Sequence, residues 1–228
     1  MNDLNTAFAE EKFSKSELRG LSTLTNDDHL IFSPGVSTGG IAEMKMVQGK
    51  SDRKVIGTTL DEKGFKYAQE LIEKYGFNSQ VKVKIEDVSK PLPYESSLFD
   101  FVYARLVLHY LSKVQLDNAL KEIYRALKPG RKLFVVVRSV ENEELKWEDS
   151  SYEEETGFTF VTYTNPVNGA KNIAHRYFHS NETITNHLKA VGFKIDSIIS
   201  YDEKLYIDFE RKIPSPKSDK LIEVVAIK

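Results

Sequence analysis

Five short apolar runs alternate with helix-like segments over the first 138 residues, and this alternation constrains the fold more than any other feature of the chain. Runs that are apolar nearly throughout are typical of buried parallel strands. Alternating strands and helices predict a parallel sheet with right-handed crossovers, and ligands of such sheets bind beyond the carboxyl ends of the strands. The expected strands are His29–Ser33, Lys54–Thr58, Val81–Ile85, Phe99–Ala104 and Lys132–Arg138.

Helix signals occupy three of the four intervals between these runs. Asp61 suits the N-cap of a helix that closes at Gly76. Two later apolar runs, on either side of a turn at Pro214 and Pro216, are expected to pair as an antiparallel hairpin. The expected helices are Gly39–Gln48, Asp61–Tyr75, Lys113–Leu127 and Ile184–Val191, and the last two strands are Phe193–Tyr201 and Leu221–Ile227.

Two segments depart from this alternation. Residues 1–26 are polar and contain apolar positions that suit a short helix or two, so we expect a helical lid over the core. Residues 140–179 begin as an acidic, aromatic stretch without clear periodicity, which we interpret as an inserted lid or loop that selects the acceptor. The chain contains no repeat or long flexible linker, so residues 1–228 are expected to form one domain.

Charge and composition exclude several classes of function. Lys plus Arg (32) and Asp plus Glu (34) nearly cancel, so no polyanion-binding surface is expected and nucleic acid is not a predicted partner. Cysteine is absent, which excludes disulfides and thiolate chemistry. No stretch approaches the roughly 20 apolar residues of a membrane span, so we expect no membrane partner and a cytoplasmic location.

Residues 33–40, with the sequence SPGVSTGG, follow the first expected strand and open a helix. Small residues in such a loop let backbone amides approach a ligand at the helix N-terminus. An ordinary glycine-rich turn that permits close packing of strand and helix remains an alternative explanation.

The motifs further along the chain identify a family. Over residues 30–138 the succession resembles the class I S-adenosylmethionine-dependent methyltransferases, in particular the branch that acts on small molecules. The resemblance implies a Rossmann-like class I methyltransferase fold, with a mostly parallel seven-stranded sheet, helices on both faces and an antiparallel C-terminal strand. The matching positions are Asp87, Pro91, Pro93, Tyr94, Phe99, Asp100, His109, Glu122, Arg125, Leu127, Lys128, Pro129 and Gly130.

The same resemblance implies S-adenosylmethionine as the cofactor and assigns residues to it. The loop from Gly35 to Gly39 would surround the methionine portion, and residues near Ala104 and Arg105 would form the floor. Thr59 and Leu60 occupy the family's ribose position, and Asp87 and Val88 the adenine edge. The expected cofactor-binding residues are Gly35, Ser37, Gly39, Thr59, Leu60, Asp87, Val88 and Ala104.

Three positions depart from the family pattern. The family carries an acid where this chain has Ser33 and a glycine where it has Ser37. It also carries an Asp or Glu for the ribose hydroxyls at the position of Thr59, and threonine cannot form that charged bidentate pair. Losing a hydrogen bond to a charged group costs about 1.5–3 kcal/mol, or about 10- to 100-fold in affinity, unless Asp61 or Glu62 reaches the ribose instead.

On the acceptor side, His109 and Arg105 are the candidate catalytic residues. The ordinary pKa of histidine suits His109 to general-base catalysis, although a histidine satisfied at a helix start is an alternative. Arg105 would bind a carboxylate or phosphate of the acceptor, or form a structural ion pair. Phe13, Arg105, His175 and Tyr177 are expected to line the acceptor pocket. His175 and His179 lack a third ligand nearby, so no metal site is expected.

The sequence therefore predicts an S-adenosylmethionine-dependent methyltransferase that transfers a methyl group in line to a small-molecule acceptor. The altered positions Ser33, Ser37 and Thr59 leave an alternative, namely a catalytically inactive methyltransferase-like protein that acts through a protein partner. A homodimer also remains open. A nicotinamide-dependent oxidoreductase is disfavoured, because its acidic strand-end residue is absent and the glycine spacing is poor.

Overall fold

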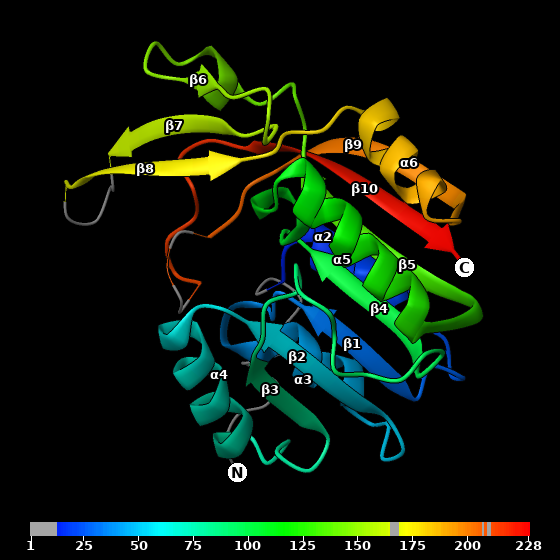
Figure 1. Ribbon diagram of the computed structural model, residues 1–228. Coiled ribbons are helices and arrows are strands. Elements are labelled where there is room, and N and C mark those ends of the chain that lie inside the picture. The colour runs from blue at the N-terminus through cyan, green and yellow to red at the C-terminus, as the bar shows by residue number, and fades with distance from the viewer. Residues whose placement is uncertain (1–12, 165–168, 207, 209–210) are drawn as a thin grey trace.

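The computed structural model describes residues 13–164, 169–206, 208 and 211–228, and its central feature is a twisted seven-stranded sheet (Figure 1). The strand order is β3-β2-β1-β4-β5-β10-β9. The first five strands in this order are parallel to one another, whereas β10 runs antiparallel to both β5 and β9. The strands are β1 (Leu30–Pro34), β2 (Lys54–Thr59), β3 (Val81–Ile85), β4 (Phe99–Arg105), β5 (Leu127–Arg138), β9 (Lys194–Glu203) and β10 (Asp219–Ile227). The expected class I methyltransferase fold is confirmed.

Helices cover both faces of this sheet because each has one apolar side. The amphipathic α5 and α6 pack with β5 and β10 in one core cluster, and α2, α3 and α4 contribute to a second cluster on the opposite face. Asp61 is the N-cap of α4, as expected, and its side chain accepts a hydrogen bond from the backbone N–H of Lys63. The helices are α2 (Lys15–Thr23), α3 (Ile41–Val47), α4 (Glu62–Lys74), α5 (Lys113–Ala126) and α6 (Asn181–Ala190).

Two short 3₁₀ turns lie at the ends of parallel strands. The first, η2 (Thr38–Gly40), connects the loop after β1 to α3, and the second, η3 (Leu108–Tyr110), follows β4. Both turns therefore lie at the edge of the sheet where a ligand is expected. A third turn, η4 (Glu143–Lys146), belongs to the segment that follows β5.

The segment after β5 forms a small antiparallel sheet of three strands, β6 (Ser151–Tyr152), β7 (Thr159–Thr164) and β8 (Lys171–Arg176). Figure 1 shows it at the top of the view, on the side toward which the arrows of β1 and β4 point. The sequence predicts only a lid or loop here, so these strands add to the expected architecture. Neither face of β8 is buried, so its residues show no alternation of apolar and polar side chains.

The expected N-terminal lid covers residues 1–26, of which 1–12 lie outside the described residues. The rest includes α2, whose side chains Leu18 and Leu21 pack against the core on the face covered by α3. Within the described parts of the chain, no helix is both long and apolar enough to cross a bilayer.

Candidate functional site

A cavity of 680 Å³ lies beyond the carboxyl ends of the parallel strands. Gly35, Ser37 and Thr38 of the loop after β1 line one end of it. Residues from η3, the end of β5 and the inserted sheet line the other end, and His109, Arg138 and Arg176 are among them. A single space therefore connects the glycine loop to the segment that the sequence reasoning assigned to the acceptor.

The glycine loop requires a glycine at its first position. Gly35 has φ +73°, and a Cβ placed there would lie 2.5 Å from the Cβ of Val107. The backbone N–H groups of Gly35 and Val36 both donate to the carbonyl of Thr58 at 2.8 Å, which holds the loop against β2. Gly39, with φ +69°, is buried beneath α4 and does not line the cavity.

Glu43 organises this loop, and the sequence reasoning missed it. Its carboxylate is fully buried and accepts hydrogen bonds from Ser33 Oγ at 2.7 Å, Ser37 N at 3.1 Å and Ser37 Oγ at 2.5 Å. The acid that the family carries at the position of Ser33 is thus replaced by one from α3, and both serines are its partners. A glutamate among the mostly apolar residues of Ile41–Val47 was the available signal.

The four residues expected to hold the ribose and adenine lie at the same edge of the sheet but outside the cavity lining. Thr59 Oγ1 accepts a hydrogen bond from the N–H of Asp61 at 3.1 Å. Asp87 Oδ1 accepts from the N–H and hydroxyl of Ser89, and Val88 is buried in the core. Leu60 is 64% exposed, and Ile85, at the end of the adjacent strand, is 50% exposed, so two apolar side chains are open to a ligand at this edge.

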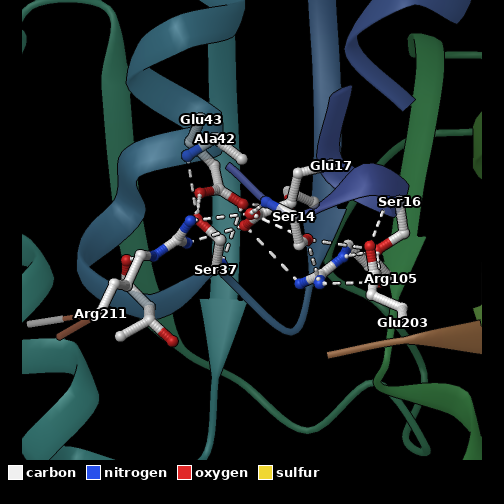
Figure 2. A network of polar contacts seen from close by, with 11 residues as sticks. Ser14, Ser16, Glu17, Ser37, Ala42, Glu43, Arg105, Glu203 and Arg211 are labelled. Carbon is white, nitrogen blue, oxygen red and sulfur yellow. Dashed lines mark hydrogen bonds and ion pairs between the residues drawn. The ribbon is translucent and has the colours of Figure 1, made fainter. Parts of the chain in front are cut away.

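Arg105 lies in a buried polar network at the end of β4 (Figure 2). Its Nε donates to Ser16 Oγ and its Nη2 to Ser14 Oγ, each at 2.6 Å. Its guanidinium also forms ion pairs with Glu17 at 3.6 Å and Glu203 at 3.7 Å. Arg105 lines the cavity, but the carboxylates of the protein already neutralise its charge. This is the structural ion pair that the sequence left open as the alternative to acceptor binding.

Glu17 connects this network to the connection between β9 and β10. Arg211 donates from Nη1 and Nη2 to the two carboxylate oxygens of Glu17, each at 2.7 Å, and both residues line the cavity (Figure 2). Burial would raise the pKa of Glu17, but the charges of Arg105 and Arg211 outweigh it and lower that pKa to about 2. Glu17 therefore stays ionised and ties α2 to the rim of the cavity.

The opposite end of the cavity contains buried polar atoms that form no hydrogen bond. In the part of the chain that the structure describes, six such atoms belong to four residues that line the cavity. Each such atom costs about 1–3 kcal/mol when nothing satisfies it, so a polar ligand or water is expected beside them. The atoms are His109 Nδ1 and Nε2, Arg138 Nε, Glu144 Oε2, and Arg176 Nε and Nη1.

His109 is fully buried in this end of the cavity. Burial, followed by the charges of Arg138 and Arg176, lowers its pKa well below the ordinary value. The imidazole is therefore neutral at physiological pH, with one nitrogen able to accept a proton.

The other predicted residues lie away from the cavity lining. Phe13 is buried in the core cluster that includes α3, and Ala104 in the opposite one. Tyr177 is buried and its hydroxyl contacts His187 Nε2 at 3.1 Å, whereas His175 is exposed beside two phenylalanine rings. The described residues contain no group of three or more His, Asp or Glu side chains arranged to hold a metal ion.

Comparisons with known proteins agree with this architecture. A family model described as a methyltransferase domain matches residues 31–130. A sterol 4-C-methyltransferase of Caenorhabditis elegans is 35% identical over 82 residues, which amount to 36% of this chain and 24% of the nematode protein. This chain thus aligns with about a quarter of that relative.

Several solved structures share the fold. A SAM-dependent methyltransferase of Methanosarcina mazei is 20% identical with a TM-score of 0.68, covering 91% of this chain and 95% of that chain. A protein of Pyrococcus horikoshii is 15% identical with a TM-score of 0.69, covering 93% and 88%. A [4+2]-cyclase is 17% identical with a TM-score of 0.60, covering 93% and 79%.

The chain therefore has the class I methyltransferase fold, as the sequence predicted, and its residues 31–130 match the methyltransferase-domain model. S-adenosylmethionine is the cofactor of the methyltransferases that it resembles. Because a cyclase has the same fold, the fold alone does not assign the reaction, and the chemistry has to be argued from the site.

Proposed function

We propose that this chain is an S-adenosylmethionine-dependent methyltransferase that acts on a small-molecule acceptor. The observation that carries the proposal is the single cavity that extends from Gly35 and Ser37 to the buried side chains of His109, Arg138 and Arg176. A methyltransferase needs such a space, because the methyl donor and the acceptor must meet in one enclosure that keeps water out.

The residues at the strand ends suit the cofactor. The loop from Gly35 to Thr38 would receive the methionine portion, with Glu43 holding the loop in shape. Leu60 and Ile85 offer exposed apolar surface to the adenine, and Asp87 would contact its edge. Thr59 offers one hydroxyl to the ribose in place of a carboxylate. When bound, S-adenosylmethionine supplies a methyl group that the lone pair of an acceptor attacks in line with the breaking carbon–sulfur bond.

The remaining residues bind the acceptor and take up its proton. His109 is the candidate general base, because its buried neutral imidazole lines the cavity. Within the described chain its ring nitrogens form no hydrogen bond, so one of them can accept a proton. Arg105 acts as a positioning residue, since its contacts with Ser14, Ser16 and Glu17 hold the N-terminal helix against the cavity rim.

Calorimetry with S-adenosylmethionine tests the cofactor, and mass spectrometry of the purified protein tests whether the cofactor or its demethylated product is carried along. Binding at micromolar to millimolar concentration is expected. No binding at millimolar concentration would defeat the proposal. The substitution of the ribose acid by Thr59 favours one alternative, a catalytically inactive protein that acts through a protein partner, and turnover of any methyl acceptor would exclude it.

A further inference from the structure

At the acceptor end of the cavity, several buried guanidinium nitrogens form no hydrogen bond to any residue that the structure describes. Arg138, at the carboxyl end of β5, and Arg176, at the end of β8, come from different sheets and line the same wall. Arg138 Nε and Arg176 Nε and Nη1 are buried and have no hydrogen-bond partner in the described chain. Guanidinium groups are normally saturated with hydrogen bonds when buried, so three nitrogens without a well-aligned acceptor indicate room for a better hydrogen-bond acceptor.

A carboxylate already lies between the two guanidiniums. Glu144 Oε2 is 3.3 Å from Arg176 Nη1 and 3.6 Å from Arg138 Nη1, yet it forms no hydrogen bond with either. Arg138 also pairs with Asp219. The space between the arginines therefore admits an anion, but the carboxylate of Glu144 is too poorly aligned to satisfy the donors.

We propose that Arg138 and Arg176 form a subsite for a carboxylate group of the methyl acceptor, which would displace Glu144 from between them. The proposal rests on the function proposed above and specifies its substrate class. The two arginines are already paired with Glu144 and Asp219, and displacing Glu144 would leave one net positive charge. A monoanion therefore suits the subsite better than a phosphate dianion. Tyr110, Trp147 and Tyr163 line the same cavity and would contact a flat or apolar body of the acceptor.

A ligand-observed NMR titration without cofactor tests the subsite, with benzoate, its neutral methyl ester and phenyl phosphate as probes. The wild type is expected to bind benzoate about tenfold or more tightly than methyl benzoate. Arg176→Met is expected to abolish this difference. Lys171→Met is the matched control, because it removes an exposed positive charge from the same strand outside the cavity. It should leave the difference in affinity between benzoate and methyl benzoate unchanged.

Glu144→Gln removes the competing carboxylate and is expected to strengthen benzoate binding by roughly two- to fivefold, a gain that misfolding cannot produce. Equal binding of benzoate and methyl benzoate to the wild type overturns the proposal. Tighter binding of phenyl phosphate than of benzoate also overturns it. So does a wild type that binds a neutral sterol but not benzoate, if Arg176→Met leaves the sterol affinity unchanged. Because no cofactor is present, these outcomes are independent of the calorimetry with S-adenosylmethionine.

Discussion

Glu43→Ala is the change that most directly tests how the glycine loop is held. The substitution removes the acceptor of three hydrogen bonds, from Ser33 Oγ and from the N–H and hydroxyl of Ser37, at a position with no solvent access. A hydrogen bond to a charged group contributes about 1.5–3 kcal/mol. The two hydroxyls can rotate toward other acceptors, but the N–H of Ser37 cannot. We therefore expect a loss of about 3 kcal/mol, well below the sum of three full bonds.

For a chain of this size, about 3 kcal/mol corresponds to a fall in Tm of roughly 6–12 °C, measurable by near-ultraviolet circular dichroism. Glu43→Gln retains one oxygen and should lose less. Ser33→Asp combined with Glu43→Ala returns a carboxylate to the family's position and should recover part of the loss. If the Tm of Glu43→Ala stays within about 2 °C of the wild type, or if the double variant is no more stable than the single one, the assignment of Glu43 is wrong.

Three further changes have defined outcomes. Thr59→Asp should tighten S-adenosylmethionine binding by about 10- to 100-fold in calorimetry, with Thr59→Asn as the uncharged control; an unchanged Kd contradicts the ribose assignment. Gly35→Ala should lower Tm more than Gly49→Ala, because both glycines have φ +73° but only Gly35 has a neighbour, Val107, at 2.5 Å; equal losses contradict the steric argument. Glu17, with its pKa lowered from 4.5 to about 2, should contribute about 3 kcal/mol of stability that is fully present above pH 4.5 and lost as the pH falls toward 2. Chemical denaturation across that range should show this loss, and Glu17→Gln should remove it.

The fold could be predicted because its signals are local. The central parallel strands β1, β4 and β5 contain apolar runs, and Asp61 caps α4 through a contact two residues away. The inserted sheet could not be predicted in the same way, since β7 and β8 pair with each other at the surface and bury no continuous apolar face in the main core. Hydrogen bonding between those strands leaves little trace in the side chains.

The acceptor end of the site depends on contacts between residues far apart in the chain. His109 was recognisable because it follows a strand within a motif. Its neighbours Arg138 and Arg176 were not, because nothing local shows that β8 docks on η3 through the hydrogen bond from Tyr177 N to His109 O. The predicted residues His175 and Tyr177 lie on either side of Arg176, which lines the cavity, and a shift of one position along a strand reverses the face.

The three departures from the family pattern have different physical consequences. Ser33 and Ser37 are both explained by Glu43, which brings a carboxylate to the loop from α3 instead of from β1. At the ribose position no carboxylate is held in the way that Glu43 is held at the loop, because Thr59 Oγ1 accepts the N–H of Asp61 and Asp61 Oδ1 caps α4. Any weakness in cofactor binding should therefore originate at the ribose alone, and a single carboxylate at position 59 should correct it while changes at Ser33 or Ser37 should not.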